Sequence, residues 1–195
     1  MIISDSHRFI FIHIPRTGGT SITDIFYRKK LKFERPFLQH TNASSPEFQS
    51  VPFSDYTTFA FVRNPWARIY SWYALLAKYN PDWKQSFTFE EFVCNYDDIA
   101  QAHSIDNGFC FNQLDYLHNQ QGQLVTNFIG RYENYQQDVY KIFAQLGVTL
   151  DTIPHLNRTC LIDYRGKYTA ASKSIVDKLC AKDIEYFDYH FDISN

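Results

Sequence analysis

The chain has 195 residues and a mass of 23.0 kDa, enough to bury one substantial core and too little for two domains of ordinary size. Hydrophobic residues make up 45% and charged residues 21%, so a wholly disordered chain and a fibrous protein are excluded. The net charge of −2 argues against a general nucleic-acid binder, because such proteins carry an excess of basic residues. We therefore expect a single domain over residues 1–195, with any anion site built by local placement of basic side chains.

No apolar run approaches the roughly 18 residues that a membrane-spanning helix needs, and the first residues lack the pattern of a secretory leader. The cysteines are Cys94, Cys110, Cys160 and Cys180. They form no C-x-x-C pair, and the seven histidines form no H-x-x-x-H pair, so neither residue type predicts a metal site. We expect free thiols in a reducing compartment, hence a cytoplasmic location, and no metal.

The first predicted element is a strand over residues 8–14, because R-F-I-F-I-H-I is nearly continuous in apolar residues. The turn P-R-T-G-G-T-S (15–21) leads from it into a helical pattern. Two adjacent glycines let the backbone approach a ligand, and the N–H groups and hydroxyls of Thr20 and Ser21 would face an anion at the positive end of the helix. With Arg16 in the loop, the turn predicts a phosphate-like ligand. The alternative is an ordinary strand-to-helix turn with a solvated Arg16.

A second unit of the same kind begins with the strand pattern T-T-F-A-F-V at residues 57–62, followed by a helix for which Asn64 is a natural N-cap. Arg63 stands at the carboxyl end of the strand, where ligands bind in open parallel sheets. Ser71 lies about two helical turns later, with Arg68 between them. Two units that each supply Arg and Ser predict one ligand with two separate anionic groups. A structural ion pair for Arg63, with Ser71 as a spectator, is the alternative.

The rest of the chain alternates further helix and strand signals with a loop at residues 38–52. We expect a helix opened by the capping box of Thr88 and Glu91, a helix over 111–118 and a strand over 125–132. A further helix should be capped by Asn134 and ended by Gly147. The last predicted element is an amphipathic helix over 170–187, with Ile175, Leu179 and Ile184 inward. Strands alternating with helices favour a parallel sheet covered on both faces. The predicted fold is therefore α/β: a three-layer α/β/α domain with a central parallel sheet and a P-loop-like nucleotide-binding fold.

Five segments together resemble a known family. They are F-I-H-I-P-R-T-G-G-T-S (11–21), F-A-F-V-R-N-P-W-A-R-I-Y-S-W-Y (59–73), F-I-G-R-Y-E-N (128–134), P-H-L-N-R-T (154–159) and A-K-D-I-E-Y-F-D-Y-H-F (181–191). The first two resemble the 5′-phosphosulfate loop and the 3′-phosphate strand and helix of sulfotransferases. The likeness is to the Golgi-type carbohydrate sulfotransferases, a family that includes the chondroitin and uronyl 2-O enzymes and bacterial relatives.

The resemblance implies 3′-phosphoadenosine 5′-phosphosulfate (PAPS) as sulfuryl donor, a hydroxyl of a carbohydrate as acceptor, and no obligatory metal. It also implies roles for residues that match the family's motifs. Arg16 would bind and stabilise the leaving group, Thr17, Gly18, Gly19, Thr20 and Ser21 would surround the 5′-phosphosulfate, and Arg63 with Ser71 would bind the 3′-phosphate.

The family's acceptor base is often a histidine between the two loops, and here L-Q-H-T-N-A (38–43) supplies His40. Transfer to an alcohol requires removal of the hydroxyl proton, and a neutral imidazole is matched to that task near pH 7. An idle, exposed loop histidine is the alternative for His40. His13 is expected to be a satisfied residue of a buried strand, and His155 is a weaker candidate near the acceptor.

Two further segments have open roles. The basic loop Tyr164–Lys167, with Arg165 and Lys167, is a candidate to close over the adenosine end of the donor, and Tyr132 with Glu133 matches a family Y-E element that is equally consistent with a structural role. Two other functions also remain open: a nucleotide kinase or triphosphatase, and a non-catalytic nucleotide- or carbohydrate-binding module. A kinase or triphosphatase is disfavoured because the glycine turn at residues 15–21 lacks the lysine of the G-x-x-x-x-G-K-S/T motif. No nucleic-acid partner is expected, and the sequence leaves the oligomeric state open.

Overall fold

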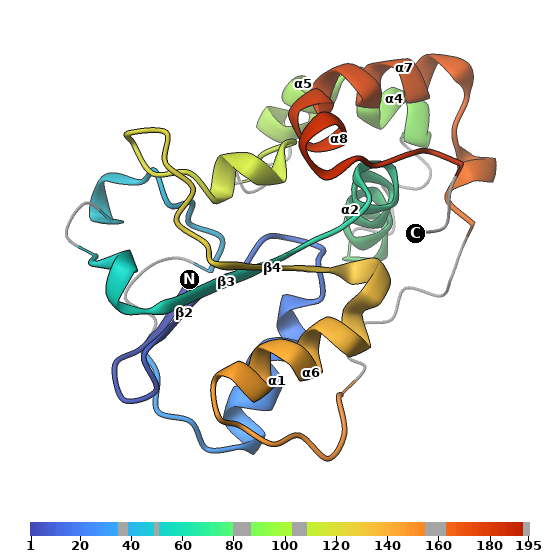
Figure 1. Ribbon diagram of the computed structural model, residues 1–195. Coiled ribbons are helices and arrows are strands. Elements are labelled where there is room, and N and C mark those ends of the chain that lie inside the picture. Colours follow the sequence, from blue (N-terminus) through green and yellow to red (C-terminus); the bar gives the residue numbers. More distant parts are fainter. Residues whose placement is uncertain (35–38, 49–50, 80–86, 103–108, 155–162, 193–195) are drawn as a thin grey trace. The chain divides into compact units, whose positions relative to one another are not determined.

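The computed structural model describes residues 1–34, 39–48, 51–79, 87–102, 109–154 and 163–192 (Figure 1). Its contacts group the chain into two compact units. The first contains residues 1–63 and 113–157, and the second contains residues 64–112 and 158–194. The single domain over residues 1–195 stays a prediction.

A four-stranded sheet forms the centre of the first unit, with strands β1 (Ile2–Ser4), β2 (Phe9–Ile12), β3 (Thr57–Val62) and β4 (Phe128–Arg131) in that order. β2, β3 and β4 run parallel, with Phe11 opposite Phe59 and Val62 opposite Arg131, which confirms the three predicted strands. β1 pairs antiparallel with β2 and was not predicted, because three residues are too few to show a pattern. The carboxyl ends of β2, β3 and β4 therefore share one edge of the sheet.

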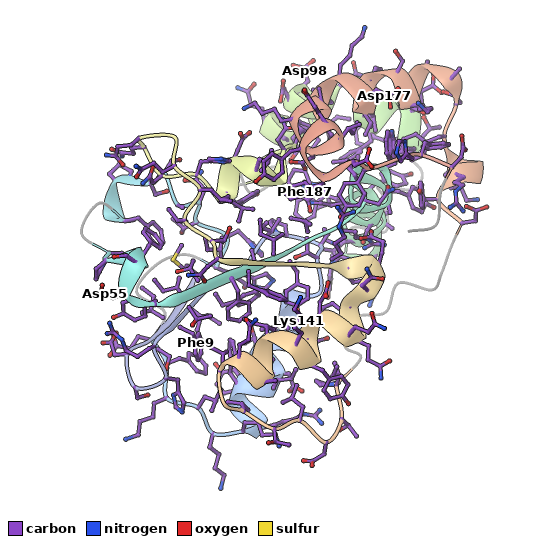
Figure 2. All side chains as sticks on the ribbon, in the orientation of Figure 1. Phe9, Asp55, Asp98, Lys141, Asp177 and Phe187 are labelled. Atoms are coloured by element: carbon purple, nitrogen blue, oxygen red, sulfur yellow. The ribbon has the colours of Figure 1, made fainter. Side chains whose placement is uncertain are left out.

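Two helices pack on this sheet, α1 (Gly19–Arg28) and α6 (Tyr135–Gln145). Their apolar stripes meet the phenylalanines of β2 and β3 in one core (Figure 2), which includes Phe9, Phe11, Phe59, Phe61, Ile22, Ile25, Phe26, Val139, Ile142 and Phe143. An α/β class is thus confirmed. The second helical layer of the predicted three-layer arrangement stays a prediction.

Short 3-10 turns connect these elements: η1 (Pro46–Phe48), η2 (Phe53–Asp55), η3 (Gln113–Tyr116) and η4 (Tyr132–Asn134). The helix predicted over residues 111–118 is wrong, since only η3 forms there and the chain then turns into a bridge between His118 and Leu124. Asn134 occupies the N-cap position of α6 but makes no side-chain cap, because η4 leads directly into the helix. Gly147 ends α6 as predicted, with φ of +70° and its N–H donated to Ala144.

The second unit is helical, with α2 (Pro65–Tyr79), α4 (Phe89–Cys94), α5 (Tyr96–Ala102), η5 (Arg165–Lys167), α7 (Ala170–Leu179) and α8 (Ala181–Phe187). Both predicted helix starts are confirmed. Asn64 Oδ1 accepts the N–H of Ala67 at 3.2 Å, and Thr88 with Glu91 forms a capping box. Asn64 Nδ2 also donates to the carbonyl of His190 at 3.1 Å.

The long helix predicted over residues 170–187 is two helices, because the backbone leaves helical geometry at Cys180. The predicted inward residues are only half-buried, and the buried stripe lies at positions next to them. It consists of Ser172, Val176, Cys180, Asp183 and Phe187. Among the described helices, none has both the length and the apolar character that crossing a membrane requires.

Candidate functional site

The glycine turn connects β2 to α1 at the carboxyl edge of the sheet, as predicted. Gly18 has a φ of +89°, and a side-chain carbon placed on it would lie 2.6 Å from the ring of Tyr135. The hydroxyl of Tyr135 donates to the Gly18 carbonyl at 2.7 Å, and burial raises the pKa of this hydroxyl above its usual value. The ring of His13 fills the space that a side chain on Gly19 would need. Both glycines are therefore required by sterics, and Tyr135 holds the turn as a protonated donor.

Two further residues shape the loop. Arg16 adopts a φ of +68°, in the left-handed region that a residue with a side chain rarely occupies. Thr17 is fully buried, and its hydroxyl donates to the carbonyl of Ile14 at 2.9 Å. Thr17 thus fixes the loop from inside while Arg16, half-buried, is held in a strained backbone conformation that other contacts must maintain.

The first turn of α1 contains the residues predicted to donate to an anion. The N–H of Ser21 is donated to the Gly18 carbonyl at 3.0 Å, and its hydroxyl hydrogen-bonds with Tyr135. Among the predicted backbone donors, a ligand contact by Gly18, Gly19 and Thr20 at the positive end of the helix stays a prediction. Thr20 is exposed, whereas Ser21 is buried, so Ser21 stabilises the turn and Thr20 is the hydroxyl directed to solvent.

Arg63 joins this loop from the end of β3. Its Nη1 donates to the carbonyl of Arg16 at 3.3 Å, and its guanidinium carbon lies 4.3 Å from the ring centre of Tyr132. The side chain of the fully buried Gln113 makes two hydrogen bonds to the Arg63 backbone, accepting from the N–H and donating to the carbonyl, both at 2.8 Å. The structure therefore brings together Arg16 and Arg63, two of the predicted anion-binding residues. The guanidinium of Arg63 lies between the carbonyl of Arg16 and the face of the Tyr132 ring.

His40 lies beside the same loop. Its Nδ1 is 2.8 Å from the carbonyl oxygen of His13, and the two rings meet edge to face with centroids 4.7 Å apart. Because a carbonyl oxygen can only accept, Nδ1 carries the hydrogen, and in the neutral ring Nε2 holds the lone pair. His13, buried as predicted, packs in turn on Gly19 at the start of α1. The His13 ring therefore lies between the candidate base and the glycine turn that is predicted to bind an anion.

Ser71 and Arg68 belong to the second unit, in α2. Ser71 is buried with a relative exposure of 3%. Arg68 is fully buried, donates to the carbonyls of Phe111 at 2.8 Å and Cys110 at 3.0 Å, and stacks on the ring of Phe109. Arg68 is therefore a structural residue of this unit, and the role of Ser71 towards a 3′-phosphate stays a prediction.

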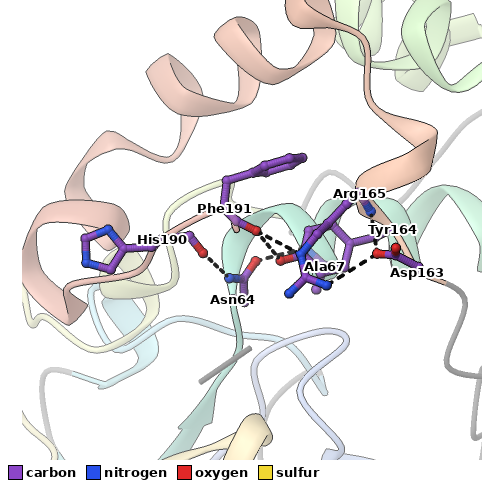
Figure 3. A network of polar contacts seen from close by, with 7 residues as sticks. All are labelled: Asn64, Ala67, Asp163, Tyr164, Arg165, His190 and Phe191. Carbon is purple, nitrogen blue, oxygen red and sulfur yellow. Dashed lines mark hydrogen bonds and ion pairs between the residues drawn. The ribbon is translucent and has the colours of Figure 1, made fainter. Parts of the chain in front are cut away.

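The basic loop at η5 also belongs to the second unit (Figure 3). The hydroxyl of Tyr164 and the Nε of Arg165 both donate to the carbonyl of Phe191, at 3.0 Å and 3.3 Å. Arg165 also forms an ion pair with Asp163 at 3.5 Å, while Lys167 is exposed. Arg165 thus anchors the C-terminal segment, and a nucleotide contact by either basic residue stays a prediction.

Three residues near the site escaped prediction: Gln39, Gln113 and Tyr135. Gln113 lies 50 positions from Arg63 in the chain, and its segment resembled a helix, so no local signal pointed to it. Tyr135 stands two residues after Glu133 of the Y-E element, which was the one available signal. His155 lies outside the described residues. Within the described part of the chain, no group of three or more His, Cys, Asp or Glu side chains is placed to hold a metal ion.

Comparison with known proteins shows the family of the chain. The profile of the sulfotransferase family matches residues 1–190, so the chain belongs to the sulfotransferase family. An uncharacterized protein of the archaeon Archaeoglobus fulgidus is 30% identical over 114 residues, which are 58% of this chain and 86% of that relative. No solved structure matches the chain.

Proposed function

We propose that this protein transfers the sulfuryl group of PAPS to a hydroxyl group, with carbohydrates as the acceptor class. The observation that carries the proposal is the meeting of Arg63 with the glycine turn, where Nη1 of Arg63 lies 3.3 Å from the carbonyl of Arg16. This contact places two guanidinium-bearing residues and a helix N-terminus at one edge of the sheet. A nucleotide with anionic groups at both its 3′ and 5′ positions matches such a set of donors.

The reaction assigns one step to each part of the site. Nε2 of His40 accepts the acceptor's hydroxyl proton as that oxygen forms a bond to sulfur. The bond between sulfur and the bridging oxygen of the 5′-phosphate breaks, and adenosine 3′,5′-bisphosphate leaves with the electron pair. The Arg16 guanidinium and the N–H groups of Gly18 to Thr20 stabilise the charge that develops on the leaving phosphate.

Arg63 and Ser71 bind the 3′-phosphate in this proposal, so they determine which nucleotide enters. The planar fork of Arg63 suits a phosphate, and the ring of Tyr132 supports the guanidinium on one face. Alignment of donor and acceptor supplies much of the rate, because the displacement at sulfur requires the attacking and leaving oxygens to lie in line.

The test is a transfer assay with PAPS and a panel of polysaccharides that expose different hydroxyls, following both sulfated product and adenosine 3′,5′-bisphosphate. We expect transfer to at least one carbohydrate, and loss of turnover in His40→Ala with nucleotide affinity nearly intact. Retained turnover in His40→Ala would remove it as the base. Donor binding without transfer to any acceptor would instead favour a binding module, and magnesium-dependent hydrolysis of ATP would favour a triphosphatase.

A further inference from the structure

The ring of His13 contacts both the candidate base His40 and the residue that precedes it, Gln39. The side-chain nitrogen Nε2 of Gln39, the residue before His40, lies 3.2 Å from Nδ1 of His13. The ring of His40 itself meets the ring of His13 edge to face. His13 thus fixes both the base and the residue that precedes it in the loop.

The environment of His13 makes its ring a rigid support. The ring is buried, with a relative exposure of 4%, and stacks on Phe11 with centroids 5.5 Å apart. Its opposite edge abuts Gly19, where no side chain could fit. Because the His13 ring is confined between a strand and the start of a helix, it has one orientation available. The ring of His40, which packs on it, is therefore held in a fixed orientation as well.

The hydrogen bonds set the protonation pattern of both rings. An amide nitrogen only donates, so Nδ1 of His13 accepts from Gln39 and the neutral ring carries its hydrogen on Nε2. The His13 carbonyl accepts from Nδ1 of His40, which leaves the lone pair of His40 on Nε2, the nitrogen that must take the proton.

We propose that His13 and Gln39 are positioning residues that hold His40 in the Nδ1–H tautomer and aim its Nε2. This inference rests on the proposed role of His40 as the base. Neither residue touches the reacting atoms: Gln39 anchors the loop on the His13 ring, and that ring fixes the plane of His40. The same ring borders Gly19, so it also couples the position of the base to that of the anion-binding turn.

Three substitutions separate these contacts. Gln39→Met removes the amide donor at an exposed position and keeps the length of the side chain. His13→Phe keeps an aromatic ring against His40 and removes the Nδ1 acceptor. His13→Asn places an amide oxygen near the position of Nδ1, so it restores the acceptor for Gln39 but loses the ring. His40→Ala serves as the reference for complete loss of the base.

Two readouts are measured on each variant. Long-range nitrogen–proton NMR of the ligand-free protein reports the tautomer of His40, and steady-state kinetics with PAPS separates kcat from KM. The His13 carbonyl that accepts from Nδ1 of His40 belongs to the backbone and stays in every variant, so Gln39→Met and His13→Phe act by letting the loop shift away from it. We expect both variants to mix the His40 tautomers and to lower kcat by about tenfold or more, with the KM for PAPS and the thermal shift by adenosine 3′,5′-bisphosphate changed less than about twofold. His13→Asn should recover part of the Nδ1–H tautomer relative to His13→Phe.

An unchanged His40 tautomer in Gln39→Met would overturn the proposal, even if both His13 variants fail to fold. If kcat and the affinity for the bisphosphate fell equally in the His13 variants, the proposal would also be overturned. His13 would then only support the glycine turn. Failure of the proposed function has a different signature, in which wild-type protein neither binds the bisphosphate nor transfers sulfate while His40 still shows the Nδ1–H tautomer.

Discussion

Nη1 of Arg63 donates to the carbonyl oxygen of Arg16 across 3.3 Å, so the end of β3 is tied to the glycine turn that follows β2. These residues lie 47 positions apart in the chain and are brought together because β2 and β3 pair in parallel. The contact joins the side chain of Arg63 to the backbone of Arg16, and the proposed function assigns these two residues to opposite ends of one nucleotide.

Replacing Arg63 should weaken the binding of nucleotides that carry a 3′-phosphate. We expect Arg63→Ala to raise the Kd for adenosine 3′,5′-bisphosphate by about 10- to 100-fold, since a charge-assisted hydrogen bond contributes about 1.5 to 3 kcal/mol. Binding of adenosine 5′-monophosphate should change little, and Arg63→Lys should fall between, because it keeps the charge without the planar fork. Titration calorimetry measures all of these, and equal losses for both nucleotides would contradict the assignment.

Gln113 should be important for stability because it satisfies both backbone groups of Arg63. Gln113→Leu leaves the Arg63 N–H and carbonyl without these partners, so we expect the free energy of unfolding to fall by about 2 to 4 kcal/mol. Gln121→Leu is the matched control, because Gln121 is exposed, and it should change stability by less than about 0.5 kcal/mol. Urea denaturation gives both values. A loss for Gln113→Leu no larger than that of the control would show that the pair of hydrogen bonds contributes nothing.

The backbone conformation of Arg16 predicts that two inactive variants differ in stability. Both Arg16→Gly and Arg16→Ala remove the guanidinium and should abolish transfer, but only glycine relieves the left-handed conformation at φ +68°. That conformation costs an ordinary residue about 1 to 2 kcal/mol, and glycine loses about 0.5 to 1 kcal/mol more entropy on folding. Arg16→Gly should therefore be more stable than Arg16→Ala by up to about 1.5 kcal/mol. The opposite order in urea denaturation would rule out strain at this position.

Alkaline pH should destabilise the second unit through Cys180. Burial, and to a lesser degree the nearby Asp183 and Asp177, raises the pKa of its thiol from 9.0 to about 12. The folded state keeps this proton where the unfolded state loses it, so the contribution is full below about pH 9 and is lost as the pH rises towards 12.

Between about pH 8 and about pH 10, the free energy of unfolding should therefore fall by about 1 kcal/mol more in the wild type than in Cys180→Ala. Urea denaturation of both proteins at each pH measures the difference. An identical pH dependence would mean that Cys180 titrates normally in the folded protein.

Local patterns predicted most of the fold. The strands β2, β3 and β4 were recognisable because each is a short apolar run, and the caps at Asn64 and Thr88 were recognisable because capping uses neighbouring residues. The break at Cys180 was not, since helical periodicity continues through it and only the backbone angles change.

The candidate site divides in the same way. The glycine turn and Arg63 were predictable, because they occupy defined places after buried strands. Gln113 and Gln39 were not, since their partners are chosen by tertiary contacts over distances of 50 and 26 positions. Arg68, which the sequence places between Arg63 and Ser71 without a role, is a structural residue, and its burial is visible only in the folded unit.

The most direct test of the central claim is the melting temperature of the protein with adenosine 3′,5′-bisphosphate and, separately, with magnesium and ATP. A ligand present at about 100 times its Kd stabilises the folded state by about 2.7 kcal/mol, which should raise the Tm by roughly 5 to 10 °C in a protein of this size. We predict this rise with the bisphosphate and little change with ATP. A rise with ATP and none with the bisphosphate would contradict the account.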